Sequence, residues 1–229
     1  MGKLHAAIIA VAVVVVPPAW GQSKNLAPGF TNLPKGATIV IMPADIELFS
    51  MSAGGILEPK ADWTETATRH LKAAFIKRKE KLGLRTIELA EKDADELHEV
   101  NTLHAAVARA IDMHHFGPAA LPTKEGKLDW SLAEAVAPVK KASGADYALF
   151  SWIRDSYASA ERKAAMIGMA LLGVGLSAGI QVGYASLVDL NTGQVVWFNR
   201  MARGHGDLRE AEPAAETVDA LLTAFPAAQ

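Results

Sequence analysis

The pattern of apolar and polar positions separates short apolar runs from longer stretches with helical spacing. The first run, residues 37–42 (ATIVIM), is rich in β-branched residues and ends at Pro43, which predicts a buried strand. Residues 22–36 before it show no period and predict an extended leader. Residues 47–60 contain two glycines and a proline without a consistent period, and this predicts a loop.

A helix is predicted to begin at Asp62, which has the spacing of a capping box with Glu65, and to end at Gly83. Its apolar positions recur every three or four residues; they are Trp63, Ala67, Leu71, Ala74 and Phe75. Residues 85–89 (RTIEL) then alternate between polar and apolar side chains, which predicts a second strand.

Two further helices are predicted in the middle of the chain. The first starts at the capping pair Asp93 and Glu96. Its predicted inward positions are Leu97, Val100, Leu103, Val107 and Ile111. The second covers residues 129–142, with a cap at its first residue, a bend at Pro138 and a stop at Gly144.

The last third of the chain has the clearest strand pattern. Residues 145–153 (ADYALFSWI) form an apolar run that predicts a third strand. Two more β-rich runs, 183–190 and 194–201, flank the loop 191–193 (NTG), which ends in glycine as three-residue hairpin loops do. Residues 212–225 predict a closing helix, whose inward positions are Val218, Leu221, Leu222 and Phe225.

The predicted order is therefore strand, helix, strand, helix, helix, strand, followed by an antiparallel hairpin and a C-terminal helix. Such an order implies right-handed crossovers and a sheet covered by helices. We predict a single α/β domain over residues 37–226, with a mixed sheet and helices packed on it.

The N-terminus has the pattern of an export signal. Lys3 supplies a positive charge, an apolar run of 11 residues follows at 6–16, and two prolines end it. A membrane-spanning helix needs about 20 apolar residues, which disfavours the alternative of an N-terminal membrane anchor. We predict a signal peptide over residues 1–21, cleavage near Gly21 and a periplasmic mature protein, with peripheral attachment to the outer membrane as an open alternative.

Composition narrows the class of partner. Apolar residues make up 50% of the chain, which excludes disorder throughout. The absence of cysteine excludes disulfides, cysteine-ligated metals and the thioether-linked lipid of a lipoprotein. The formal net charge of −2 becomes −3 when Lys3 leaves with the signal peptide, and a surface this near neutral argues against nucleic acid as a partner. We predict no cofactor.

The most unusual feature is a charge-free stretch after Lys163, of which residues 164–182 are apolar and rich in glycine. Three interpretations remain open: a transmembrane helix, a buried or surface-docked helix, and a pair of extended segments that form an apolar hairpin. The first is disfavoured because Arg162 and Lys163 would flank its outer end, against the positive-inside tendency. The third requires closure into an oligomeric barrel within lipid.

Two stretches around this segment resemble a bacterial envelope superfamily. They read GADYALFSWIRDS (residues 144–156) and QVGYASLVDLNTGQVVWFNR (residues 181–200). They are similar to CsgG-like curli secretion proteins and TolB N-terminal-like domains, in which a strand reading GADY precedes a hairpin reading V-D-x-x-T-G-x-V. The resemblance extends over residues 37–225 in the order of elements.

The resemblance implies a compact α/β domain that acts in the periplasm, often at the outer membrane, through protein contacts and without chemistry of its own. Members of the secretion branch are lipidated and form rings whose apolar hairpins build a pore. This chain lacks the cysteine that lipidation requires, which makes a soluble relative the closer match.

One catalytic pattern is present. Residues 175–179 (GLSAG) match the G-x-S-x-G nucleophile elbow, and Asp189 and His205 follow in the acid-then-histidine order of an α/β-hydrolase. An elbow lies on a strand-to-helix turn within a large sheet, whereas this pattern precedes a hairpin. A serine hydrolase that uses Ser177 is therefore the remotest of three functional hypotheses.

The histidines and the basic run have simpler explanations than ligand binding. His98 and His104 are six residues apart and His114 and His115 are adjacent, so neither pair lies one helical turn apart as a helical metal site requires. The basic run at residues 77–81 fits the C-terminus of a helix, where cations complement the helix dipole. Contact with anionic lipid is the alternative.

We predict that the protein acts as a non-enzymatic scaffold or assembly module of the cell envelope, which binds envelope proteins or itself. The runner-up is a membrane-inserting, oligomeric component of a secretion pore. The candidate contact residues are Met166, Met169, Leu171, Leu172, Val174, Leu176, Trp197 and Phe198. Trp197 and Phe198 point to opposite faces of one strand, so a helix or a partner should cover one of them. Arg154, Asp155 and Arg200 are predicted to pair across neighbouring strands.

Overall fold

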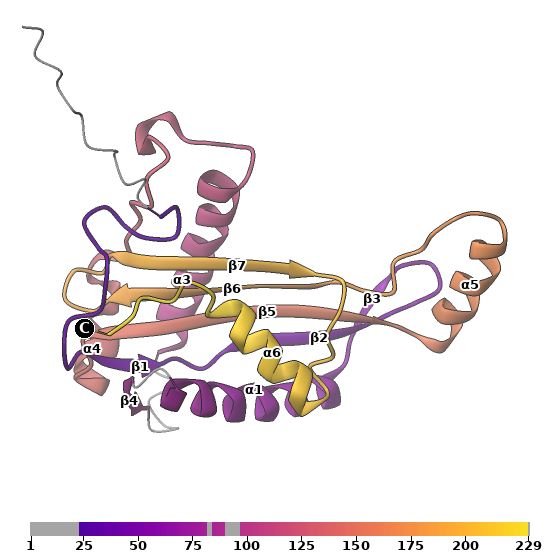
Figure 1. Ribbon diagram of the computed structural model, residues 1–229, viewed down its shortest axis with the longest axis horizontal. Helices are drawn as coiled ribbons and strands as arrows, with labels where there is room; N and C mark the ends of the chain where they lie inside the picture. The colour runs from indigo at the N-terminus through magenta and orange to yellow at the C-terminus, as the bar shows by residue number, and fades with distance from the viewer. Residues whose placement is uncertain (1–22, 82–83, 90–96, 229) are drawn as a thin grey trace, which may run out of the picture.

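The computed structural model describes residues 23–81, 84–89 and 97–228, and seven strands in these ranges form one mixed sheet (Figure 1). The predicted signal peptide, the stop at Gly83 and the capping pair Asp93 and Glu96 lie outside the described residues. The strands are β1 (Thr38–Ile41), β2 (Asp45–Met51), β3 (Leu57–Pro59), β4 (Arg85–Glu88), β5 (Tyr147–Ala158), β6 (Gln181–Asp189) and β7 (Val195–Arg203).

Strand β5 organises the sheet because it is long enough to serve two sets of neighbours. Its first half pairs in parallel with β1, and its second half pairs in parallel with β2. Strand β4 lies beyond β1, and β3 lies beyond β2. On its other side β5 pairs antiparallel with β6, which pairs in turn with β7. The predicted mixed sheet with a C-terminal hairpin is confirmed.

Helices cover both faces of the sheet, but they do not extend along its whole length (Figure 1). The helices are α1 (Ala61–Lys81), α3 (His98–Ile111), α4 (Ala137–Ser143), α5 (Ala160–Leu171) and α6 (Ala211–Leu221), with a π-helical turn at Asp112–Phe116 and 3-10 turns at Pro122–Lys124 and Ala133–Val136. On one face, α1 and α6 bury a core that includes Leu71 and Leu221. On the other face, α3 and α4 bury a second core that includes Ile111 and Phe150.

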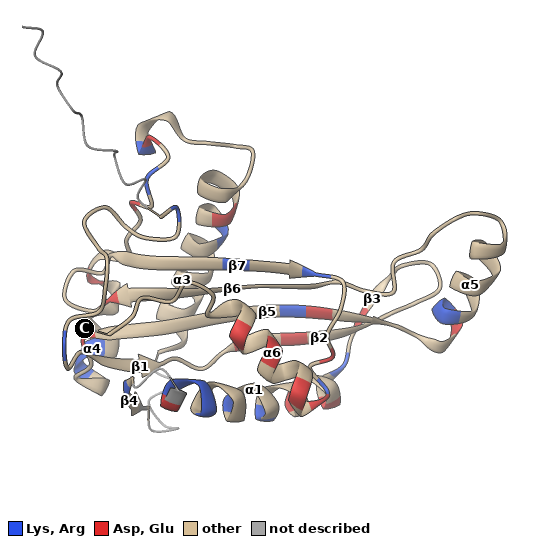
Figure 2. Ribbon diagram, viewed as in Figure 1, with Lys and Arg blue, Asp and Glu red and all other residues tan. Residues whose placement is uncertain are grey.

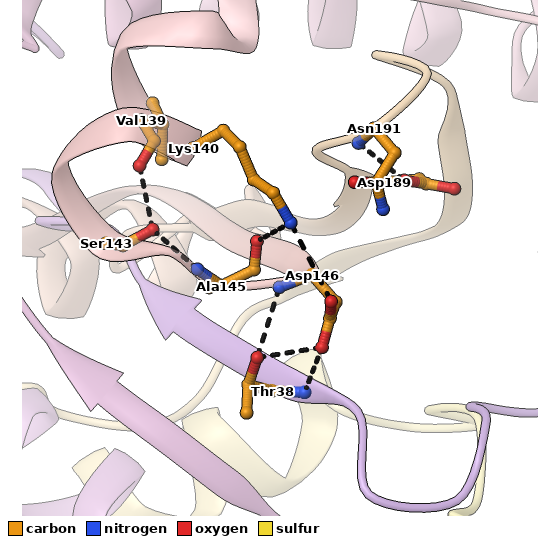
Figure 3. Close-up of polar contacts among 8 residues, drawn as sticks. All are labelled: Thr38, Val139, Lys140, Ser143, Ala145, Asp146, Asp189 and Asn191. Carbon is orange, nitrogen blue, oxygen red and sulfur yellow. Dashed lines mark hydrogen bonds and ion pairs between the residues drawn. The ribbon is translucent and has the colours of Figure 1, made fainter.

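Polar residues in the two stretches that resemble the envelope superfamily, 144–156 and 181–200, stabilise strand ends and turns (Figure 3). Asp146 of the GADY sequence accepts hydrogen bonds from the Thr38 backbone N–H at 2.9 Å and from Thr38 Oγ1 at 2.8 Å, which ties β5 to β1. These bonds favour the carboxylate and lower the pKa of Asp146. Asp189 Oδ1 accepts from Asn191 N–H at 2.8 Å, and Gly193 adopts the predicted left-handed conformation at φ +73°. These residues have structural roles.

Three local predictions were wrong. Residues 47–60 contain β2 and β3 instead of a loop, and the two glycines that hid the strand pattern lie in the turn between them. Helix α1 begins at Ala61, so Asp62 lies within its first turn and is not the cap. The helix expected from residue 129 is a 3-10 turn followed by α4, because Pro138, which has no backbone N–H, occupies the first turn of α4.

Helix α3 buries most of the predicted inward positions but not Leu103. Leu97, Val100 and Ile111 are buried, whereas Leu103 is 40% exposed, and His104 and Ala108 are buried as well. His104 stacks on Phe150 at 4.1 Å between ring centroids, and its Nε2 lies 2.5 Å from Ser186 Oγ. Burial lowers the pKa of His104 to about 3, so this histidine is a neutral core residue.

Candidate interaction surface

One end of the sheet continues into a projection that is not covered by the helices that pack on the sheet in the described ranges (Figure 1). The last paired residues of the β5–β6 ladder are Asp155 and Gln181. Beyond this pair, the chain continues through α5 and a loop, beside the turn between β2 and β3. We call this projection, made of residues 52–57 and 159–180, the arm. The predicted segment 164–182 therefore forms neither one long helix nor a two-stranded hairpin.

Helix α5 of the arm has a defined start and end. Ser159 is the N-cap of α5, because its Oγ accepts a hydrogen bond from Arg162 N–H at 3.2 Å. The helix ends at Leu171, and Gly173 follows with φ +79°, a conformation that favours glycine. Among the described helices none is both long enough and apolar enough to cross a membrane, and α5 has 12 residues.

Arg162 connects the segments of the arm to one another. Its Nε donates to the Ser177 carbonyl oxygen at 2.8 Å, and its Nη1 lies 3.4 Å from the carbonyl oxygens of Ser52 and Ala53. Only 8% of this residue is exposed, and no carboxylate pairs with it among the described residues. Three carbonyl oxygens therefore replace the water that the guanidinium loses, and they hold α5, the following loop and the β2–β3 turn together.

The outward surface of the arm is apolar. Of the nine large apolar side chains that are exposed in the described residues, seven belong to the arm. They are Ile56, Leu57, Ile167, Leu171, Leu172, Val174 and Ile180. Figure 2 shows charged residues on α5 only near its first turn. Exposed apolar side chains gathered in this way mark a contact surface more often than scattered ones do.

Six of the eight predicted contact residues lie on the arm, three of them exposed and three half-buried. Leu171, Leu172 and Val174 are exposed on the arm. Met166, Met169 and Leu176 are also on the arm but are half-buried.

Trp197 and Phe198 do not belong to this surface, and their selection as contact residues is corrected. Both are completely buried, because each face of β7 is covered at this point. Trp197 packs edge-on against Phe225, with 5.0 Å between ring centroids. Phe198 stacks between Phe116 and Tyr184 at 5.6 Å from each.

A buried polar network lies where the arm leaves the sheet. Asp155 is only 3% exposed, and its Oδ2 accepts hydrogen bonds from Tyr157 Oη at 2.5 Å and Gln181 Nε2 at 2.6 Å. Gln181 Oε1 accepts in turn from Arg203 Nε at 2.7 Å and from Thr217 Oγ1 at 3.0 Å. The network therefore connects β5, β6, β7 and α6 at the base of the arm.

Asp155 has no ion pair among the described residues, and burial raises its pKa to about 6. Of the residues predicted to pair across neighbouring strands, Arg154 does so, with Asp45 of β2 at 2.8 Å. Arg200 of β7 pairs instead with Asp112 of the π-helical turn, at 3.0 Å. The sequence gives no signal that separates Asp155 from these exposed charges except that alternate residues of a strand point to opposite faces.

Ser177 is not placed as a catalytic nucleophile. It lies in the exposed loop of the arm, where its Oγ donates to the Gly179 carbonyl oxygen at 3.0 Å. Asp189 is at the far end of the nine-residue strand β6, and eight residue steps along a strand span roughly 26 Å. The predicted serine–acid pair therefore does not assemble.

No group of three or more metal-binding side chains in the described ranges could hold an ion. The adjacent histidines His114 and His115 each contact a different backbone carbonyl oxygen. His114 Nδ1 lies 2.7 Å from the Ala119 carbonyl oxygen, and His115 Nε2 lies 2.7 Å from the Lys24 carbonyl oxygen.

Comparison with known proteins gives only distant likenesses. Neither the family models nor the curated proteins compared with the sequence give a match. Among solved structures, the LpoB C-terminal domain from Salmonella enterica is 14% identical, with a TM-score of 0.32 over 77% of this chain and 87% of that one. Lipoprotein GNA1162 from Neisseria meningitidis is 12% identical, with a TM-score of 0.34 over 82% of this chain and 96% of that one.

A PelC dodecamer from Paraburkholderia phytofirmans is also 12% identical, with a TM-score of 0.39 over 86% of this chain and 92% of that one. At these TM-scores the likenesses carry no argument about function. None of the three is named as a CsgG-like or TolB-like protein, so that resemblance stays a prediction.

Proposed function

We propose that this chain is an exported protein of the cell envelope that acts as a non-enzymatic scaffold or assembly module, and that the arm docks on an apolar surface of a partner protein. The observation that carries the proposal is the gathering of seven of the nine large exposed apolar side chains of the described residues on the arm. Burial of these side chains in a partner is favourable in proportion to the apolar area removed from water.

The chemistry of the arm favours protein over lipid as its partner. Helices that lie on membrane surfaces carry Lys or Arg on a polar face and aromatic residues at the interface. The arm has no aromatic residue, and its charged residues are Glu161, Arg162 and Lys163. Arg162 is buried within the arm, which leaves one exposed cation. Met166 and Met169 add flexible side chains that adapt to a partner surface.

Gly168 supplies a second argument for a partner. A glycine inside a helix costs about 1 kcal/mol relative to alanine, so it usually has a packing reason. A Cβ atom at Gly168 would meet none of the described atoms within 4 Å outside its own helix backbone and chain neighbours, so the described part of the chain supplies no such reason. Close approach of a partner at Gly168 would supply one.

A fractionation experiment tests the proposal. Cells that express the wild type or the double variant Ile167→Glu/Leu171→Glu are cross-linked with formaldehyde before lysis, so that complexes survive dilution and high pH, and the complexes are sized after extraction with carbonate. We expect the wild type to be released by carbonate in a complex larger than the monomer, and the double variant to run as a monomer. Release only by detergent, or equal sizes for the two proteins, would count against the proposal, and the first result would favour insertion into a membrane.

A further inference from the structure

The outward face of α5 has the spacing of a helix-pairing surface. Ala160, Ala164, Ile167 and Leu171 are separated by four, three and four residues, which places them in one line along the helix. All four are exposed, with Ile167 at 69% and Leu171 at 84%. We call these four residues the outer face. Arg162, on the other side of the helix, faces the rest of the arm.

Two opposite charges flank the outer face, one on each side. With about 100° between successive residues, Glu161 lies about 90° to one side of the outer face and Lys163 about 70° to the other. Both side chains are exposed, and neither forms an ion pair within the described part of the chain. The N-terminal end of α5 and the Ser159 side chain hold the pKa of Glu161 below its usual value, so this carboxylate is charged at neutral pH.

A two-fold axis parallel to the helix makes this arrangement complementary to itself. Rotation about such an axis turns the outer faces toward each other and brings Glu161 of one copy to the side of Lys163 of the other, twice in each pair. An antiparallel pair would leave both charges opposite apolar positions of α5 instead. Opposite charges beside an apolar line set partner choice and orientation in helix pairs.

We infer that the outer face of α5 binds the same face of a second copy of this chain, as a parallel pair of helices. The inference rests on the proposed function and names its partner. Ala160 and Ala164 of the outer face are small, and so is Gly168, which lies about 70° from the outer face on the Glu161 side; these small residues let the two helix axes approach closely. The helix is only about 18 Å long, so a pair of these helices buries less area than the roughly 1,200 Å² of a stable protein interface. The pair is therefore weak in dilute solution and forms where copies are concentrated.

Disulfide formation between introduced cysteines tests the orientation directly, because the chain has no cysteine of its own. In a parallel pair, residue 171 of one copy faces residue 171 of the other. We expect the full chain carrying Leu171→Cys to give a disulfide-linked dimer under mild oxidation. The matched control Ala178→Cys, at an exposed position in the loop of the same arm, should give much less. Equal yields from the two variants would rule out the pairing.

Charge exchange tests the complementarity. Glu161→Lys and Lys163→Glu each place like charges across the pair, and we expect each to weaken dimerisation in sedimentation experiments by about fivefold. The double variant Glu161→Lys/Lys163→Glu should restore dimerisation to near the wild-type level. Thermal melting of each variant checks that the fold is retained.

The two proposals fail in different ways. If the variants dimerise alike, or the chain stays monomeric at high concentration, the self-pairing is wrong. A carbonate-released complex that still depends on Ile167 and Leu171 would then preserve the proposed function, with a different protein as the partner. If neither the self-pairing nor the carbonate-released complex is observed, both proposals are wrong.

Discussion

The two ends of β5 use similar apolar sequences in opposite ways. At its start, residues 147–153 lie between the cores under α1, α6 and α3, and side chains such as Phe150 and Ile153 are almost inaccessible to solvent. Beyond its end, α5 and its loop carry an equally apolar sequence that faces solvent. The difference lies in the covering elements, because the helices that pack on the sheet stop before the arm (Figure 1).

The glycines show the same contrast. In the body of the fold, a Cβ at Gly193 would lie 2.2 Å from the Ala133 carbonyl oxygen, and one at Gly183 would lie 2.9 Å from the Trp152 carbonyl oxygen. These glycines permit close packing within the chain. In the arm, a Cβ at Gly168, Gly173 or Gly175 would have no described atom within 4 Å, whereas one at Gly179, where the arm rejoins the sheet, would lie 1.8 Å from the Ser156 carbonyl oxygen. The body is packed on both faces of its sheet, whereas the apolar face of the arm is not covered by any of the residues that the structure describes.

Truncation of a large side chain gives the largest contrast between the two regions. Trp197→Ala removes a completely buried side chain and should lower the free energy of unfolding by about 3–5 kcal/mol. Leu171→Ala removes an exposed side chain and should change it by less than about 0.5 kcal/mol. Urea unfolding followed by circular dichroism measures both. A large loss for Leu171→Ala would show that the arm packs within its own chain.

The boundary between the regions should respond to pH through Asp155. Its pKa of about 6 exceeds the usual 3.8, so the folded state binds the proton more tightly than the unfolded state. This contribution to stability is complete below pH 4 and is lost as the pH rises through 6, by about 3 kcal/mol in all. The measurement is urea unfolding between pH 4 and pH 8. Asp155→Asn should flatten the profile, and an unchanged profile would exclude Asp155 as its cause.

Loosening of the arm should leave the body intact. Arg162→Lys keeps the charge but loses the planar donors that reach three carbonyl oxygens. We expect faster amide hydrogen exchange in residues 52–57 and 172–180, and a change of less than about 1 kcal/mol in global unfolding. Lys163→Gln is the control, since Lys163 is exposed at the adjacent position. The slowly exchanging amides in the interior of β5 and β6 should keep their exchange rates.

The smallest expected effect has opposite signs in the two measurements that detect it. Gly168→Ala should strengthen α5 in the isolated chain by about 0.5–1 kcal/mol, seen as slower amide exchange in the helix. The same change should weaken association through the outer face, since Gly168 lies at its edge on the Glu161 side, about 70° from its line, where a closely packed partner would meet the added methyl group. Faster exchange, or stronger association, would contradict the role given to Gly168.

The sequence predicted the fold well where one pattern dominated. The apolar run at 145–153, the NTG loop and the closing helix correspond to β5, the β6–β7 turn and α6. Predictions failed where a residue type had a different structural role from its usual one. The glycines at 54 and 55 suggested a loop although they form only the turn between two strands, and His104 is polar in the pattern but buried in the structure.

The candidate site was only partly predictable. An apolar, charge-free run after Lys163 indicated a contact segment, and the exposed Leu171, Leu172 and Val174 belong to it. Trp197 and Phe198 could not be separated from these by sequence, because hydrophobicity does not tell whether a helix will cover a residue. The bonds of Arg162 and Asp155 depend on contacts between distant segments, which no local pattern encodes.

Photo-cross-linking in intact cells tests most directly whether the arm is a site of protein contact. A photoreactive amino acid replaces Leu171 on the arm or, as the control, Leu103, which is exposed on α3 of the body. We expect a protein adduct of defined mass from position 171 that is absent from position 103. An equal pattern from both positions, or adducts to lipid alone, would show that the arm is not a site of protein contact.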